Sequence, residues 1–469
     1  MTTQPSTDEK KQAGNDSTSL DSVVNVETEG ISEKALLRKL DWKLLPGLTL
    51  LYLSSFLDRS NGVFPLTSCF SLSPSYVLFE IPCNIVLKRT TPKIWLPTLM
   101  LAWGIVATLM GVSQNLAGFL VARFFLGVTE SGLFPGVVFY LSMWYKRTET
   151  HYRVALFFSA ASLAGAFGGI LAYGIGFMRG TGGLGGWRWI FILEGLLTVV
   201  VAVFAYFFIH NYPDTAPFLT DSERSYIHAR LKGDSDATND EKFTWGNVAS
   251  ALKDYKCWMY GLGFHTMSLP LYTLSLFLPT IIRELGYSAA NAQLLTVSPY
   301  AFATILTVIV AILSEKTKKR APFILTSSSL AIIGYIILLS TNKRPGVSYL
   351  GTIFAADGIY PSTAIVLSWP AANVSGQSKR ATATAMTITI GNLGAVLGTQ
   401  LYRPKTAPRW FLGHEFALGY LCANLLNTSL LWWLLTRENR LKRERAVSGE
   451  TGGEGTVRSD EDVRFIFQT

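Results

Sequence analysis

The chain alternates between long apolar stretches and short polar connections. Between residues 44 and 436 the apolar stretches are about 20 residues long and almost free of charge, which is enough to span a bilayer core as helices. Backbone groups in lipid must be hydrogen-bonded within their own segment, so helices are the expected structure. The alternation at roughly ten-residue spacing that marks a membrane barrel is absent. The pattern therefore predicts an all-α integral membrane protein.

Twelve membrane spans follow from this pattern. We expect them at residues 44–66, 69–87, 94–112, 116–142, 152–178, 187–210, 256–281, 292–313, 321–341, 347–369, 379–402 and 412–436. The second span is the poorest, because it holds several serines, two prolines and Glu80, and almost no loop separates it from the first.

One long polar connection divides the spans into two groups of six. The expected organisation is a disordered N-terminal tail (1–40), a first six-helix half (41–210), a central loop (211–255), a second half (256–436) and a C-terminal tail (437–469). The halves resemble each other, because VLKRTTPKIWLP follows span 2 and LSEKTKKRAPFI follows span 8. Both are basic turns that contain proline. Two such halves are typical of a transporter whose site lies at their interface.

The basic residues indicate orientation rather than a nucleic-acid partner. The 469-residue chain is 49% hydrophobic, only 16% charged and carries a formal charge of +9. Its lysines and arginines gather at the ends of spans, with twelve in the short loops predicted to be inside and eight in those predicted to be outside. By the positive-inside rule, both termini and the central loop are expected in the cytoplasm.

Ionisable residues inside the spans are the most informative positions, because each costs about 2.5–3.5 kcal/mol at the bilayer centre unless it has a partner or a wet cavity. They are concentrated in the first half: Asp58, Arg59, Glu80, Arg123, Glu130 and Glu194, against His265 and Asp357 in the second. This asymmetry indicates that one half handles charge and the other mainly shapes a pocket.

Arg123 and Glu130 are seven residues apart, which is close to two helical turns, so they project from one face. They are too far apart to contact each other, and Asp58 and Arg59 on the first span are the candidate partners. In the functional interpretation Arg59 attracts an anion, Arg123 balances Asp58, and Glu130 or Asp58 takes up a proton. The alternative is a set of interhelical salt bridges with no ligand.

The remaining candidates are weaker. His265 either faces the cavity, where it would contact the ligand and titrate near neutral pH, or packs as a hydrogen-bonding helix residue. Glu80 and Glu194 read as structural partners, and Asn373 and Asn392 as hydrogen-bond groups between helices. GTGGLG at 180–185 fits a nucleotide-binding pattern but has no strand before it. No catalytic constellation, cofactor motif or metal-ligand pattern is present, so we do not expect an enzyme.

The sequence also resembles a known family. RFFLGVTESGLFPGVVFYLSMWYKR closely resembles the fourth-helix signature of the fungal anion:cation symporters, the allantoate permease-like branch of the major facilitator superfamily. LDRSN, YVLFEIPCNIVLKR, GWRWIFILEG, WPAANVSGQSKRA, GNLGAVLG and APRWFLGH resemble it in order and spacing. The likeness implies the twelve-helix major facilitator fold, alternating access and proton-coupled uptake of small carboxylates such as nicotinate, allantoate or pantothenate. It also implies that Asp58 and Glu130 carry protons, that Arg59 holds the carboxylate and that Arg123 pairs with an acid.

The chain departs from the family pattern in one place. Between LDRSN and YVLFEIP it has only GVFPLTSCFSLSPS, where the family continues further. This shortening of the helix 1/2 region is the pattern of a splice-junction error or a defective copy.

From the spans, the charged residues and the family resemblance together, we expect a monomeric fungal plasma-membrane importer, proton-coupled and specific for an organic anion. The alternatives are a non-transporting nutrient receptor or a transport-defective copy on the same fold.

Overall fold

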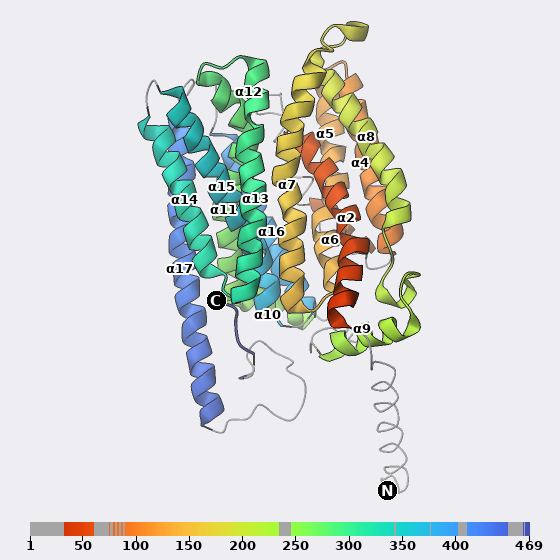
Figure 1. Cartoon of the computed structure of the whole chain (residues 1–469), viewed down its shortest axis with the longest axis vertical. Helices are drawn as coiled ribbons and strands as arrows, with labels where there is room; N and C mark the ends of the chain where they lie inside the picture. The colour runs from red at the N-terminus through yellow and green to blue at the C-terminus, as the bar shows by residue number, and fades with distance from the viewer. Residues whose placement is uncertain are drawn as a thin grey trace, which may run out of the picture.

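The computed structural model describes residues 32–60, 75, 78–79, 82–83, 86–87, 90–233, 245–341, 344–375, 377–401, 410–448, 463 and 465–469. All regular elements in these ranges are helices. Figure 1 shows the long helices running side by side along the longest axis. The short helices α9 (Asp221–Gly233) and α10 (Trp245–Lys253) lie at one end of the bundle, and α12 (Ala289–Leu295) lies at the other. We call these the α9 end and the α12 end.

The helices form two groups that follow the order of the chain (Figure 1). The first group is α2 (Glu33–Ser60), α4 (Pro92–Val112), α5 (Leu116–Glu130), α6 (Leu133–Ser142), α7 (Arg147–Gly176) and α8 (Gly186–Phe208). The second is α11 (Tyr255–Glu284), α13 (Val297–Thr317), α14 (Ala321–Ser340), α15 (Pro345–Asn373), α16 (Gln377–Thr399) and α17 (Phe411–Val447). The two groups meet where α7 packs on α13 and α15, α2 on α11, and α6 on α16.

The predicted spans correspond to helices wherever the structure describes them. Within the described residues, eight helical stretches are long and apolar enough to cross a membrane: 92–112, 116–142, 152–176, 186–208, 291–317, 321–340, 345–373 and 411–447. The first, seventh and eleventh predicted spans fall on α2, α11 and α16, and in α16 the apolar part is Thr382–Gly398. The second, 69–87, lies mostly outside the described residues.

Both helical regions extend into the predicted tails. Helix α2 begins at Glu33, and Leu36 and Leu40 are 3% and 0% exposed because this first part packs inside the protein. Helix α17 continues to Val447, past the expected end of its span. Helical structure therefore begins before residue 40 and continues past residue 437, which low average hydropathy did not reveal because only single helix faces are buried.

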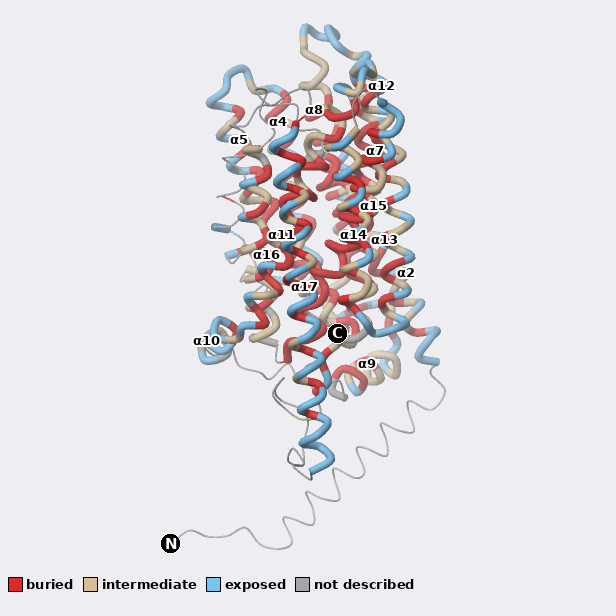
Figure 2. The backbone as a smooth tube through the Cα atoms, turned by 90° about the vertical axis from the view of Figure 1, so that its left-hand side faces the viewer, coloured by how far each residue is buried: buried red, intermediate tan, exposed pale blue. Residues whose placement is uncertain are grey.

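Exposed residues lie along the outer faces of the long helices (Figure 2), and many of them are large and apolar, as expected for lipid contact. Phe207 and Leu426, for example, are 76% and 74% exposed. Inside, glycines allow close helix packing. A Cβ added at Gly358 of α15 would lie 2.3 Å from the backbone nitrogen of Ala331 in α14, and the space is occupied by backbone that cannot move away. Small residues at such contacts are the usual means of helix association in membranes.

Candidate functional site

A narrow cavity lies between the two groups of helices. Its lining comes from both: Tyr52, Ser55 and Phe56 of α2, Glu130 of α5, Leu133 and Phe134 of α6, Phe158 of α7, Phe264, Leu271 and Tyr272 of α11, Leu367 of α15, and Ile388 and Asn392 of α16. The volume open to water-sized molecules is about 40 Å³. This space holds a few waters, whereas ligand sites for small molecules usually measure about 300 Å³ or more. The cavity is therefore too narrow in this structure for a ligand of that size.

Aromatic rings form much of the cavity wall. The ring of Tyr52 lies 6.0 Å from that of Phe56, 5.7 Å from that of Phe134 and 6.3 Å from that of Phe158. Phe264 and Tyr272 contribute rings from the other half. Such a wall favours an organic ligand with an apolar or planar body, because flat rings offer large contact area at little conformational cost.

The polar groups of the lining are few and separated. Glu130 is only 5% exposed and is an ionisable residue of this lining. Across the cavity, the buried Nδ2 of Asn392 has no hydrogen-bond partner among the described residues. A buried amide donor without an acceptor is costly, so this group is available to an oxygen atom of a ligand or to water. The sequence analysis had interpreted Asn392 as a helix-packing residue.

Helix α5 positions both residues that the sequence paired. It begins with Asn115, whose side chain accepts a hydrogen bond of 2.7 Å from the Gly118 backbone nitrogen, and it ends at Glu130, just before the start of α6. Arg123, two turns earlier, is 8% exposed, and its guanidinium lies 5.3 Å from the ring centre of Phe119 and 5.4 Å from that of Phe191. Glu130 therefore lines the cavity, while Arg123 lies among aromatic rings outside its lining.

The acid–base pair predicted on the first span cannot be placed as side chains. Asp58 and Arg59 belong to the last turn of α2, the helix that supplies Tyr52, Ser55 and Phe56 to the cavity, but their side chains lie outside the described residues. Glu80 also lies outside them. Their roles remain predictions.

His265 does not belong to the cavity lining. Its Nδ1 is 2.9 Å from the carbonyl oxygen of Ile390, and its Nε2 is 3.4 Å from the hydroxyl of Tyr420. The ring thus joins α11 to α16 and α17, next to an apolar hollow that Tyr420 helps to line. This is the packing alternative given for His265, whose ligand contact stays a prediction.

Two further acids lie away from the lining. Glu194 of α8 is 3% exposed, and Asp357 of α15 is partly buried. The Oδ1 atom of Asp357 has no hydrogen-bond partner within the described part of the chain. In the same part of the chain, no group of three or more acidic, cysteine or histidine residues is arranged to hold a metal ion.

At the α9 end, the first group carries a network of ion pairs that the sequence did not reveal. Arg153 of α7 donates to both carboxylate oxygens of Asp41, at 2.6 and 3.0 Å. Arg230 of α9 donates to Glu33 at 2.9 Å and also to Glu149. The hydrogen bond from Arg230 lowers the pKa of Glu33, whereas burial raises the pKa of Glu149. The network fastens α9 to the starts of α2 and α7.

The chain matches the sequence profile of the Major Facilitator Superfamily over residues 40–399. It belongs to this family. Among curated relatives, the MFS-type transporter cnsO of Penicillium expansum is 37% identical over 440 residues, 88% of this chain and 85% of the relative. The major facilitator-type transporter hxnP of Emericella nidulans is 30% identical over 456 residues, 91% of each chain.

Solved structures show the same fold. A bacterial homologue of the human lysosomal transporter Spinster, in an inward-facing and occupied conformation, has a TM-score of 0.59 at 16% identity, covering 84% of this chain and 96% of that one. The proton:xylose symporter XylE has a TM-score of 0.59 at 13% identity, with the same coverage. The protein thus has the major facilitator fold with two six-helix halves, as the sequence predicted, and is a multi-pass membrane transporter. From here the two groups of helices are called the N-half and the C-half.

Proposed function

We propose that the protein is a proton-coupled importer of a small organic anion, of the anion:cation symporter (allantoate permease-like) branch, and that it acts in a fungal plasma membrane as a monomer. The α9 end is then cytoplasmic, together with both termini. The branch is supported by the fourth-helix segment and the other motifs quoted above, and by the fungal relatives named as transporters.

One observation carries this proposal: Glu130 is buried on the wall of a cavity between the halves, and the opposite wall presents the Asn392 amide. In this proposal the Glu130 carboxyl takes up the coupling proton. A positioned amide N–H donates to a carboxylate oxygen. With Arg59 one turn beyond the cavity-lining residues of α2, the site combines a proton acceptor with groups that attract an anion.

The roles proposed for the remaining site residues follow the sequence. Asp58 joins Glu130 in proton coupling, Arg59 holds the carboxylate of the substrate through its planar fork, and Arg123 balances an acid. His265 contacts substrate only after a rearrangement that frees its ring from Ile390. Alternating access would open the cavity first to the α12 end and then to the α9 end.

Uptake into proteoliposomes tests the proposal. A panel of labelled carboxylates that includes nicotinate, allantoate and pantothenate is offered at two external pH values, with the neutral amide of each acid as the matched control. We expect accumulation of at least one acid that grows as the external pH falls and that a protonophore abolishes. Equal uptake of acid and amide, or accumulation independent of the pH gradient, would contradict the proposal. No uptake of any acid would favour a receptor or a transport-defective copy.

A further inference from the structure

Residues 465–469, here called the FIFQT segment, lie in extended form against the α9 end of the C-half. Their partners come from α11, α15, α17 and the residue that precedes α14, which are far apart in the sequence. The sequence analysis had assigned these five residues to a featureless tail.

Two asparagine side chains bind the main chain of this segment. The amide of Asn439 accepts from the Phe467 nitrogen at 2.8 Å and donates to the Phe467 carbonyl at 2.9 Å. Asn373 does the same for Gln468, at 2.7 and 2.9 Å. The Trp369 indole donates to the Gln468 carbonyl as well, at 2.8 Å. Each asparagine thus pairs with one residue as a neighbouring strand would, which is how extended peptides are commonly recognised.

The side chains alternate between buried and exposed, as in any extended segment. Phe465 and Phe467 are 4% and 3% exposed, whereas Ile466 between them is 43% exposed. The ammonium groups of Lys256 and Lys442 lie 4.7 and 4.2 Å from the ring centre of Phe467. Because both phenylalanine rings are buried, the groove distinguishes Phe-x-Phe from a polar segment.

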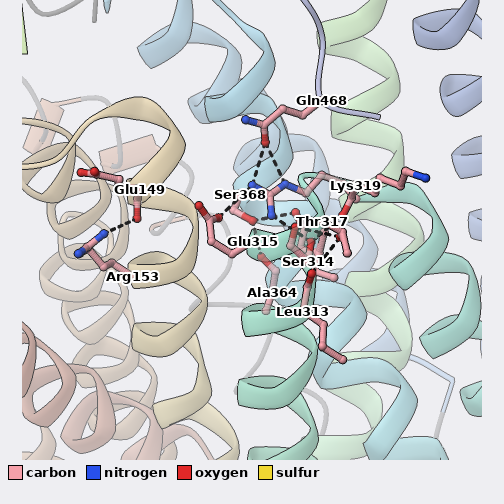
Figure 3. A network of polar contacts seen from close by, with 12 residues as sticks. Glu149, Arg153, Leu313, Ser314, Glu315, Thr317, Lys319, Ala364, Ser368 and Gln468 are labelled. Atoms are coloured by element: carbon pink, nitrogen blue, oxygen red, sulfur yellow. Dashed lines mark hydrogen bonds and ion pairs between the residues drawn. The ribbon is translucent and has the colours of Figure 1, made fainter. Parts of the chain in front are cut away.

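Gln468 completes the surroundings of a buried cation. Arg320 is 1% exposed, and its Nε and Nη2 donate to the Gln468 Oε1 at 3.1 and 2.8 Å. It also donates to Ser314 and Glu315, near the end of α13 (Figure 3). Burial lowers the pKa of Arg320 to about 10, so the guanidinium stays charged at neutral pH and needs these acceptors.

The helices joined in this way include α11 and α15, which line the cavity from the C-half. In α11, Phe264 of the lining lies between the Lys256 contact and Pro270. In α15, Leu367 of the lining lies between Pro361 and the Trp369 contact. A proline inside a helix removes a backbone hydrogen bond and marks the point where the helix bends. Each of the two helix pieces between a proline and a contact with the FIFQT segment therefore carries a residue of the cavity lining.

We propose that this groove is a binding site for an extended Phe-x-Phe-Gln segment, and that its occupancy holds these two helix pieces in place and keeps the cavity narrow. Displacement of the segment frees the pieces to bend at Pro270 and Pro361. The proposal rests on the proposed function only in requiring that the cavity open during transport.

Thiol labelling tests the effect of the segment. In a variant with the four natural cysteines replaced by alanine, Leu367→Cys reports access to the cavity, and a charged maleimide measures the labelling rate in nanodiscs. Phe467→Ala is expected to raise that rate at least about tenfold, because it removes the buried ring that holds the segment in its groove. The matched control is Ile466→Ala, which changes the exposed neighbour and should leave the rate unchanged.

Peptide binding tests the site itself. Protein truncated after Asp462 should bind a synthetic VRFIFQT peptide and recover the slow labelling rate, whereas the peptide with the Phe467→Ala change should do neither. If truncated or Phe467→Ala protein is unstable, Asn439→Ala provides a milder variant, with exposed Arg440→Ala as its control. Absence of peptide binding overturns the site, and binding without any change in labelling overturns its effect on the cavity. If the labelling rate depends on the segment but the protein takes up no carboxylate, this inference stands and the proposed function is contradicted instead.

Discussion

The two halves of the molecule hold their helices together with different chemistry. The N-half buries Arg123, Glu130 and Glu194, and its α9 end is fastened by ion pairs. Within its membrane spans the C-half relies mainly on neutral groups, although its α9 end also carries ion pairs such as Lys379–Asp254 at 2.9 Å. Asn424, fully buried in α17, donates to the Gly263 carbonyl at 3.1 Å and to the Thr266 hydroxyl at 2.9 Å.

This difference separates two tasks that a coupled transporter has to perform. Carboxylates in the N-half can change protonation, and such a change alters the charge that faces the cavity. Amides and hydroxyls in the C-half stay neutral at every physiological pH. They therefore supply shape and fixed hydrogen bonds. At the α9 end of the C-half, the FIFQT segment combines both chemistries, because asparagine amides bind its main chain and buried cations contact Phe467 and Gln468. Four experiments test the contrast.

The largest effect is expected for Glu130→Gln. Glutamine keeps the size of the side chain but cannot titrate, so accumulation driven by a pH gradient should fall about 100-fold, the lower range for removal of a proton-transferring group. Exchange of preloaded substrate should persist in part. Asp221→Asn, at a position whose side chain is 97% exposed, is the control and should behave like the parent. Accumulation that survives Glu130→Gln would assign proton coupling to another acid.

Two arginine–aspartate contacts of equal length test how much a buried ion pair contributes to the unfolding free energy, compared with an exposed one. Arg153–Asp41 and Arg224–Asp221 both measure 2.6 Å, but the arginine side chain is 7% exposed in the first pair and 29% in the second. Arg153→Ala should cost about 3 kcal/mol of unfolding free energy, because it leaves a partly buried carboxylate. Arg224→Ala should cost less than about 1 kcal/mol. Thermal unfolding in detergent would measure both, and equal losses would argue against a special role for the network.

Removal of one neutral hydrogen-bonding side chain tests whether hydrogen bonds between helices stabilise the C-half. Asn424→Ala should lower the unfolding free energy by about 1–2 kcal/mol, because interhelical hydrogen bonds in membranes have that strength. Leu426→Ala, on the exposed face of the same helix, should change it little. If Asn424→Ala were neutral, packing rather than hydrogen bonding would hold α11 against α17.

The smallest expected effect is a pH dependence of the contact between α9 and the start of α2. The hydrogen bond from Arg230 lowers the pKa of Glu33 in the folded protein. The stabilisation is therefore complete above the unfolded pKa of about 4.3 and is lost as the pH falls through the lower folded value. Hydrogen exchange of α9 amides should accelerate between about pH 5 and pH 3. Glu33→Gln should remove that dependence, and an unchanged profile would show that Glu33 does not hold α9.

Much of the fold was predictable, because membrane insertion leaves a strong signal in the sequence. Long apolar stretches predicted the helices, and the cost of burying charge singled out Glu130 and Arg123. The same reasoning could not distinguish their surroundings. Glu130 lies on the cavity wall, whereas Arg123 lies beside Phe119 of its own helix and Phe191 of α8, and this difference depends on tertiary packing.

Neutral residues and short segments were missed for a physical reason. Asn392 carries no charge, so nothing in its local sequence separated a ligand donor from a helix-packing amide. The FIFQT segment is too short to show a periodicity, and its partners Asn373, Asn439 and Arg320 are far from it in the sequence. Leu36 and Leu40, four residues apart, were a visible sign that α2 begins early.

The small cavity has a consequence for measured affinity. If the resting protein is mostly in the closed form, a substrate can bind only the open fraction, and the apparent dissociation constant rises by the inverse of that fraction. A protein that is open for about 1% of the time would bind about 100-fold more weakly than its open form does. Variants that merely favour opening would then show tighter apparent binding without a new contact to the substrate. Ranking carboxylates within one variant, rather than comparing one carboxylate across variants, therefore reports the recognition by the cavity itself.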